Sequence, residues 1–442
     1  MISIGFIFPS SDYLHDPFRG DPHSHFQLLT VLEWYFGERV NVTLIDLRGI
    51  LRKFAHYHID ECDLYLHSVY TLDYEEQLEI VSFLRKRYPS ALHIAGGPHA
   101  VTFREESLKI FDALVMGDGE ECLIQAVQDI ENGCLQKIYE QKTVLDINKY
   151  PYPNRHYLPA ATIARPGLLT LKNRPGFDRL LSTTAIFSRG CPYGCYFCAM
   201  PAIREYVPGL RYRRPDLIEQ EIEYLKREYG IQGISLLDEI SIPLSLEQAI
   251  PHLEAIGRTD IPWRAQSRVD GITPETARLA RQAGCVTMAM GIESVSQRSL
   301  DIINKRIDVG RAKDSIRLLG EQGIECRIYL IIGLPGEPED IVEQTWDFIK
   351  ETNPASAYLS IFTVRPGTEV FLNPGKFGIH KVSSDWGKTM HMYSRYDAET
   401  PRLTFEYDEI TPWGTGFSSQ RIVANYLELQ DRIKEAGMGP IR

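Results

Sequence analysis

Three cysteines lie within eight residues of one another, at Cys191, Cys195 and Cys198. Three residues separate the first pair and two separate the second, and Gly190 and Gly194 allow backbone turns that other residues resist. A loop of this length lets three thiolates converge on three irons of a cubane. One iron would stay open, because no fourth cysteine or histidine follows closely. A zinc knuckle is the alternative, and it would need that fourth ligand.

The other five cysteines stand in apolar or helical contexts, which indicates buried small side chains. They are Cys62, Cys122, Cys134, Cys285 and Cys326. The first residues have the pattern of a strand and not of a signal peptide, and no apolar run is long enough to span a bilayer, so a cytoplasmic location is expected. The net charge of −11 argues against a general nucleic-acid or anionic-membrane surface, so neither partner is expected.

The first part of the chain alternates short apolar strands with helical patterns. Strands are expected at 2–9, 42–47, 63–70, 92–97 and 113–119, and helices near 24–36, 74–87 and 120–132. This alternation predicts a parallel, doubly wound sheet that binds ligands at the carboxyl ends of its strands. Those ends carry Ser10, Ser68-Val69-Tyr70, Gly96-Gly97-Pro98-His99 and Gly117-Asp118-Gly119-Glu120.

A second alternating series begins near Thr184. Its strands are expected at 184–188, 233–238, 263–268, 286–293, 326–333 and 357–363, and its helices at 215–229, 245–257, 274–283, 296–304, 310–322 and 338–351. Six strands with intervening helices suit an incomplete (β/α) barrel, in which catalytic residues gather at the carboxyl ends of the strands. The cysteine loop directly follows the first of these strands.

A chain of 442 residues is expected to hold two or three domains. The expected boundaries are a sheet domain at 1–145, a proline-punctuated linker at 146–182, the barrel at 183–371 and a small unit at 372–442. We expect this last unit to cover the barrel mouth and to finish in a helix at 417–436. Its segment 386–396, rich in Trp, Tyr and His, is either part of a substrate pocket or a plain lid.

The cysteine spacing, with an aromatic residue before the third cysteine, resembles the radical S-adenosylmethionine (SAM) superfamily. The resemblance continues along the strand ends of the second series and includes Asn304-Lys305-Arg306. It implies that SAM binds the open iron and is cleaved reductively to a 5′-deoxyadenosyl radical. It also implies contacts of Asp238-Glu239 with the methionine amino group, of Arg268 with the carboxylate and of Glu293 near the ribose. The full set of implied SAM-binding residues is Phe197, Asp238, Glu239, Arg268, Glu293, Gly333 and Pro366.

The segments 95–100 and 117–121 resemble a branch of this superfamily that has an N-terminal cobalamin-binding domain. The implied fold is α/β, with a Rossmann-like (flavodoxin-like) cobalamin domain, a partial (β/α)6 TIM-barrel radical SAM domain and a small C-terminal domain. The alternative is a first domain that kept its fold and lost its ligand. The residues implied to bind cobalamin are Ser10, Ser68, Val69, Tyr70, Gly96, Gly97, Pro98, His99, Gly117, Gly119 and Glu120.

One motif of cobalamin proteins is incomplete. Proteins that bind cobalt through a histidine carry D-x-H-x-x-G, and here Asp21-Pro-His23 is followed by Phe26 in place of glycine. His23 is either a cobalt ligand or a loop histidine near a helix start, with Asp21 or Ser24 as the cap. Many enzymes of the branch bind cobalamin without a histidine ligand.

The resemblance implies C-methyl transfer, from SAM through methylcobalamin to an unactivated carbon that the 5′-deoxyadenosyl radical has activated. Cyclisation, ring contraction or oxidation with the same cofactors is one alternative, and an empty N-terminal module that binds a partner is another. The substrate is expected to be a small molecule or a peptide, for example a glutamine of methyl-coenzyme M reductase. The expected electron donor is ferredoxin or flavodoxin.

Overall fold

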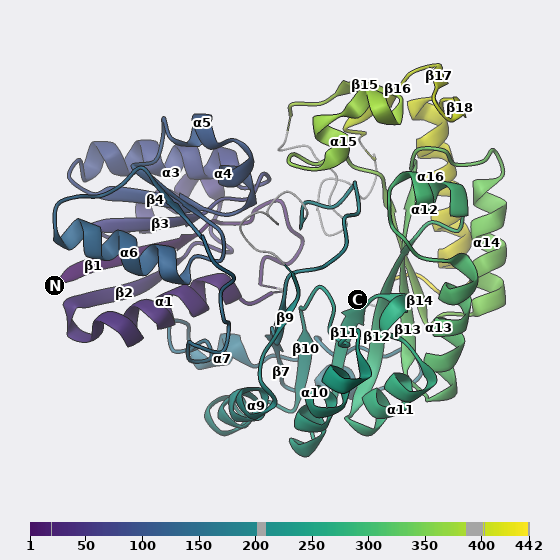
Figure 1. The fold of residues 1–442 in the computed structure, drawn as a ribbon, viewed down its shortest axis with the longest axis horizontal. Helices are drawn as coiled ribbons and strands as arrows, with labels where there is room; N and C mark the ends of the chain where they lie inside the picture. Colours follow the sequence, from purple (N-terminus) through teal and green to yellow (C-terminus); the bar gives the residue numbers. More distant parts are fainter. Residues whose placement is uncertain (19, 201–208, 386–400, 402, 441–442) are drawn as a thin grey trace.

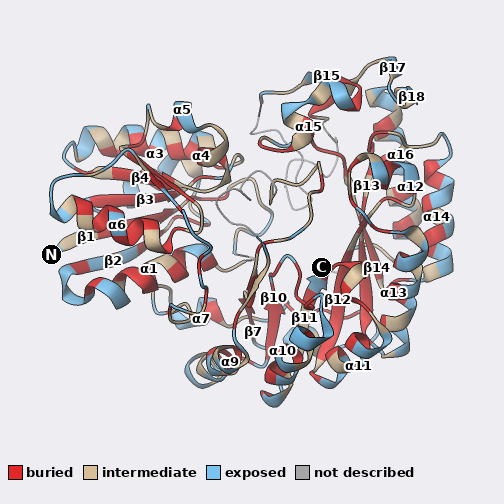
Figure 2. Ribbon diagram, in the orientation of Figure 1, coloured by how far each residue is buried: buried red, intermediate tan, exposed pale blue. Residues whose placement is uncertain are grey.

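The computed structural model describes residues 1–18, 20–200, 209–385, 401 and 403–440. Two six-stranded parallel sheets stand side by side, each with helices packed against it (Figure 1). In both sheets the strands are largely buried, and the exposed residues concentrate on the outer helices (Figure 2). Among the described residues, no helix is both long and apolar enough to cross a membrane.

The first sheet has the strand order β2-β1-β3-β4-β5-β6. Its strands are β1 (Ile2–Phe8), β2 (Val40–Asp46), β3 (Leu64–Ser68), β4 (Leu92–Gly96), β5 (Ala113–Met116) and β6 (Ile138–Glu140). Its helices are α1 (His23–Phe36), α2 (Arg52–Ala55), α3 (Tyr74–Arg87), α4 (Pro98–Thr102), α5 (Arg104–Ser107) and α6 (Glu120–Glu131). The reversal of strand order between β1 and β3 is the flavodoxin-like switch point, where such sheets bind ligands.

The second sheet is an open array in the order β14-β13-β12-β11-β10-β7. Its strands are β7 (Ser182–Ala185), β10 (Gly233–Leu236), β11 (Trp263–Ser267), β12 (Cys285–Glu293), β13 (Glu325–Ile332) and β14 (Ser356–Ile361). The helices that follow them are α9 (Pro215–Tyr229), α10 (Leu246–Arg258), α11 (Pro274–Gln282), α12 (Gln297–Ile302), α13 (Val309–Glu321) and α14 (Ile341–Thr352). The first and last strands do not pair, so the barrel is partial, as predicted.

The segment between the two sheets does more than connect them. After the short α7 (Ala160–Ile163), Leu169 and Leu171 pack on Val286 in a small cluster of their own. The backbone N–H groups of Lys172 and Asn173 donate to the two carboxylate oxygens of Glu325, at 2.8 Å each. The segment therefore closes the barrel at the amino-terminal ends of its strands.

The C-terminal part extends the barrel. It contains α15 (Glu369–Leu372), the antiparallel pair β15 (Ile379–Val382) and β16 (Phe405–Tyr407), the pair β17 (Ile410–Thr411) and β18 (Gly414–Thr415), and helix α16 (Ser419–Glu435). Helix α16 buries Ile422, Tyr426 and Leu429 in the barrel core and lies beside α14 and β14 (Figure 1). This helix thus covers the last strand, and coverage of the barrel mouth by the C-terminal unit stays a prediction. Segment 386–396 lies outside the described residues.

Candidate functional site

The cysteine loop begins where β7 ends, and a buried carboxylate fixes its start. Asp238, just past β10, accepts hydrogen bonds at 2.7 Å from the backbone N–H groups of both Phe187 and Ser188 through one oxygen. Burial raises the pKa of Asp238 to about 7, although these hydrogen bonds favour its charged form. The neighbouring Glu239 is exposed and accepts a hydrogen bond from the Gly190 backbone. Asp238, implied to bind SAM, thus also positions the loop.

None of the three loop cysteines forms a disulfide, and their thiols are close enough to shift one another's pKa. Burial raises the pKa of Cys198, and the nearby thiols of Cys191 and Cys195 raise it further. Across the loop, the Asn304 side chain donates to the Gly194 carbonyl at 2.7 Å. Three thiols on one anchored loop form a donor set that fits a cubane with one open iron. Among the described residues, no three His, Cys, Asp or Glu side chains are grouped to hold a single metal ion.

Arg268 contacts two residues of the cysteine loop. Its guanidinium is stacked 3.5 Å from the Tyr193 ring centroid, and its Nη1 lies 3.9 Å from the Cys195 sulfur. It also donates to Asp270 and to the Lys305 carbonyl, at 2.8 Å each. With these partners Arg268 ties the cysteine loop to the segment after α12. Its contact with the SAM carboxylate stays a prediction.

The remaining residues implied to bind SAM lie on the strand ends that the sequence indicated. Glu293, at the end of β12, pairs with Lys305 at 2.8 Å. The Lys305 ammonium lies 5.8 Å from the Phe197 ring centroid, so this pair lies beside the cysteine loop. Gly333 has a φ of +91°, and an added Cβ would meet Ile422 at 2.8 Å, so only glycine suits this turn. Pro366 lines the cavity described next.

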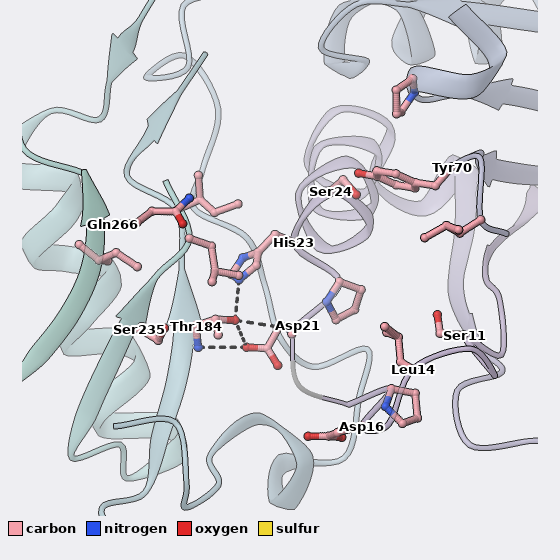
Figure 3. A pocket seen from close by; sticks show the side chains of 18 of the residues that line it. Ser11, Leu14, Asp16, Asp21, His23, Ser24, Tyr70, Thr184, Ser235 and Gln266 are labelled. Atoms are coloured by element: carbon pink, nitrogen blue, oxygen red, sulfur yellow. Dashed lines mark hydrogen bonds between the residues drawn. The ribbon is translucent and has the colours of Figure 1, made fainter. Parts of the chain in front are cut away.

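A cavity of about 850 Å³ lies between the first sheet and the open barrel. From the first sheet it is lined by loop residues after β1, by the start of α1 and by the segment after β3 (Figure 3). From the barrel it is lined by the inward-facing residues of β7, β10, β11, β12 and β13, together with Ala199, Arg365 and Pro366. Its volume is in the range of small-molecule and cofactor sites.

Only two of the residues implied to bind cobalamin line this cavity, Tyr70 and Pro98. Gly97, directly before Pro98, packs closely against the end of β3. Its φ is +90°, and an added Cβ would lie 2.9 Å from the backbone N and O of Val69. Glycine is therefore required for β3 and β4 to end so close together. Ser68, Gly96, Gly117 and Gly119 flank this region without lining the cavity.

Three other residues of that set have partners within the protein. Ser10 is buried and donates to Glu76 through both its N–H and its hydroxyl, at 2.8 Å each. His99 is buried, bonds Thr71 at 3.1 Å and stacks on Tyr74 with ring centroids 4.0 Å apart. Glu120 pairs with Arg189, two residues before Cys191, at 2.7 Å. Their predicted contacts with cobalamin stay untested, but in this structure each stabilises the fold.

The Asp21-Pro-His23 motif joins the two sheets (Figure 3). Asp21 accepts hydrogen bonds from the Thr184 backbone N–H at 3.1 Å and from its hydroxyl at 2.5 Å. His23 Nε2 lies 2.7 Å from the same hydroxyl, and Nδ1 lies 3.3 Å from an Arg155 nitrogen. Burial, with Arg155 nearby, lowers the pKa of His23 to about 3, so the ring is neutral. Neither Asp21 nor Ser24 caps α1, whose N-cap is Pro22.

Sequence reasoning missed most of the cavity lining. From the first sheet it missed Tyr13 and Asp16, and from the barrel it missed Arg264, Gln266 and Arg327. The barrel residues have a recognisable signal, because polar side chains alternate along strands that are otherwise apolar. Tyr13 and Asp16 have none.

Comparison with known proteins identifies the domain. Residues 185–349 match the family model of the Radical SAM superfamily. An uncharacterised methyltransferase of Pyrococcus horikoshii is 26% identical over 352 residues, which are 75% of this chain and 72% of the relative. An anaerobic magnesium-protoporphyrin IX monomethyl ester cyclase of Cereibacter sphaeroides is 29% identical over 310 residues, or 64% of this chain and 48% of the cyclase, so the match spans about half of the cyclase.

Among solved structures, the radical SAM methyltransferase TsrM from Kitasatospora setae, with cobalamin and a [4Fe-4S] cluster bound, has a TM-score of 0.72 to this chain. It is 17% identical, and the match covers 100% of this chain and 93% of TsrM. The predicted fold class is therefore confirmed.

The family match and the anchored cysteine loop together identify residues 185–349 as a radical SAM domain, as the cysteine spacing predicted. Domains of this class use a 4Fe–4S cluster and SAM.

Proposed function

We propose that this chain is a cobalamin-dependent radical SAM methyltransferase that moves a methyl group from SAM to an unactivated carbon of its substrate. The observation that carries the proposal is the cavity of about 850 Å³, which both the flavodoxin-like sheet and the barrel line. A group held on the first sheet and a radical formed beside the cysteine loop could both reach a substrate there. The likeness in fold to TsrM over the whole chain supports the same assignment, with cobalamin on the first sheet and the cluster in the barrel.

The cluster, held by Cys191, Cys195 and Cys198, would supply the electron that opens SAM. The protein's own residues would fix the position of the cluster by anchoring the cysteine loop. Asp238 holds the start of the loop, while Asn304 holds its middle. Because both anchors lie on barrel elements, the thiols keep a fixed direction relative to the strand ends, where SAM would bind.

Cobalamin would supply the methyl group that the substrate receives. Gly97 lets β3 and β4 end close together, and Tyr70 presents an exposed ring to the cavity at that edge. We propose that cobalamin binds without a histidine ligand. Both ring nitrogens of His23 have partners in the protein, so using the ring as a cobalt ligand would break the contact between the two sheets.

The substrate is proposed to be a small molecule, and the electron donor a ferredoxin or flavodoxin. A peptide substrate, such as a glutamine of methyl-coenzyme M reductase, would have to enter a cavity whose described walls come from both sheets. Cyclisation is the second candidate function, and the cyclase of Cereibacter sphaeroides favours it by its 29% identity.

The products formed from SAM test the proposal. Enzyme reconstituted with iron, sulfide and hydroxocobalamin is reduced and given SAM with no added substrate. We expect S-adenosylhomocysteine at about one equivalent per chain, together with slow release of 5′-deoxyadenosine. The variant with all three loop cysteines changed to alanine should keep the first product and lose the second. Formation of 5′-deoxyadenosine without any S-adenosylhomocysteine would refute methyl transfer and favour the cyclase alternative.

A further inference from the structure

The lumen of the barrel is polar where such lumens are ordinarily packed with branched apolar side chains. The parallel registers place Ser235, Arg264 and Thr287 side by side on neighbouring strands. The next inward layer places Gln266, Ala289 and Arg327 side by side. All six line the cavity, and the small Ala289 leaves room within the second layer. These two layers are called the lumen floor below.

The lumen floor contains buried polar groups without protein partners. Arg327 is 3% exposed and Thr287 is 2% exposed. One guanidinium nitrogen of Arg327 donates to the Thr170 carbonyl of the segment that closes the barrel, but its Nε has no hydrogen-bond partner. The Thr287 hydroxyl also has none. A buried donor left unpaired destabilises the protein, and a ligand that accepts its hydrogen bond would remove that cost.

Charge is divided unevenly across the cavity. Among the described lining residues, the barrel contributes Arg264, Arg327 and Arg365 and no carboxylate, whereas the acidic residues lie on the first sheet's side. Those acidic residues are Asp16, Asp21 and Asp73. The nearest acid on the same strand as Arg327 is Glu325, and the backbone N–H groups of Lys172 and Asn173 occupy both of its oxygens. The lumen floor is therefore a cationic pocket.

We propose that the lumen floor binds a carboxylate group of the substrate, with Arg327 and Thr287 as donors. A planar guanidinium offers paired N–H groups in the geometry that a carboxylate accepts, and the Thr287 hydroxyl, on the adjacent strand and in the neighbouring layer, adds a third donor. The inference deepens the proposed function by naming the class of substrate. The carboxylate would anchor one end of the molecule deep in the barrel and leave the other end toward the cysteine loop.

The test measures binding and not turnover. Full-length protein is titrated calorimetrically with 3-phenylpropionate and, as the uncharged counterpart, 3-phenylpropionamide, with neither SAM nor reductant present. We expect the carboxylate to bind about tenfold more tightly than the amide, as one charged hydrogen-bonded contact allows. Arg327→Met should abolish this preference, and Thr287→Val, which keeps the side-chain shape, should reduce it about threefold.

Arg258→Met is the matched control, because Arg258 is an exposed arginine that pairs with Glu219 on the outer helices. It should keep the full preference. If Arg327→Met does not fold, Thr287→Val and Arg327→Lys are used instead. Arg327→Lys keeps the positive charge and loses the planar pair of donors. Equal binding of acid and amide by the unaltered protein, or an unchanged preference in the Thr287 and Arg327 variants, would overturn the inference. Neither result depends on whether methyl transfer occurs.

Discussion

The guanidinium of Arg189 lies 2.7 Å from the Glu120 carboxylate and 3.6 Å from that of Asp118. Arg189 stands two residues before Cys191. Asp118 lies on the loop between β5 and α6 of the first sheet, and Glu120 is the first residue of α6. Arg211, on the strand that pairs with the loop's start, binds Asp118 as well, at 2.5 Å. The glycine-rich loop of the first sheet is therefore connected directly to the cysteine loop of the barrel.

Breaking this connection should destabilise the protein. Glu120 is 1% exposed, so Glu120→Ala leaves Arg189 largely buried opposite a single acid. We expect the free energy of unfolding in urea to fall by about 3 kcal/mol. Arg214→Met is the control, because the Arg214–Asp216 pair is exposed, and it should change stability by less than about 0.5 kcal/mol. Equal effects of the two variants would show that the Arg189 connection carries no stability.

Replacement of His23 tests whether the D-x-H motif binds cobalt. We expect His23→Phe to lower the unfolding free energy by about 2 kcal/mol, because Thr184 and Arg155 each lose a buried hydrogen-bond partner. The electron paramagnetic resonance spectrum of bound, reduced cobalamin should not change. Loss of a nitrogen splitting from that spectrum in the variant would identify His23 as the lower ligand.

Asp238 should control how well the loop retains iron. In Asp238→Asn the side-chain carbonyl can still accept from the Phe187 and Ser188 N–H groups, so iron content after reconstitution should match that of the unaltered protein. In Asp238→Ala both buried N–H groups lose their acceptor, at about 1–3 kcal/mol each. We expect this variant to retain less than about half of the iron. Equal iron contents in the two variants would contradict the positioning role.

Acid should weaken the first sheet through its buried histidines. His93 Nδ1 lies 3.1 Å from His67 Nε2, and His67 Nδ1 lies 2.8 Å from Gln77. Burial lowers the pKa of His67 to about 4 and that of His93 to about 2. Between pH 6.5 and 4 the unfolded chain therefore takes up protons that the folded chain does not. Stability should fall with falling pH, with a slope that reaches at most about 1.4 kcal/mol per pH unit for each such histidine.

The variant His93→Phe isolates one of these sites. The decrease in unfolding free energy between pH 6.5 and 5.5 should be about 1 kcal/mol smaller in it than in the unaltered protein. His156→Phe, at a side chain that is 55% exposed, serves as the control for replacing a histidine. An unchanged pH dependence in His93→Phe would mean that His93 is protonated in the folded protein.

Periodicity and strand ends made most of the fold predictable. The patterns predicted the strands of both sheets within a few residues, because most of them are buried, largely apolar runs between turn residues. Strand β6 was missed, because it has only three residues, Ile138–Glu140, and sits at an edge. The cysteine motif was predictable because its chemistry is local in sequence.

Contacts between distant segments were not predictable. Glu120 was implied to face cobalamin, yet its partner Arg189 is 69 residues away, and no local pattern marks that pairing. Ser10 likewise donates a hydrogen bond to Glu76, which lies 66 residues further along the chain. The segment that closes the barrel was expected only as a linker, because its hydrogen bonds to Glu325 span about 150 residues. The first pairing depends on how the two sheets dock, and the other two depend on how distant segments pack within one half of the molecule; periodicity encodes neither.

The cofactor content of one preparation tests the central claim most directly. The full-length protein and the variant with Cys191, Cys195 and Cys198 changed to alanine are reconstituted anaerobically with iron, sulfide and hydroxocobalamin, then desalted. The account predicts about four irons and one corrinoid per chain in the first, and one corrinoid with almost no iron in the second. A chain that binds four irons but takes up no corrinoid, or a triple variant that keeps its iron, would contradict it.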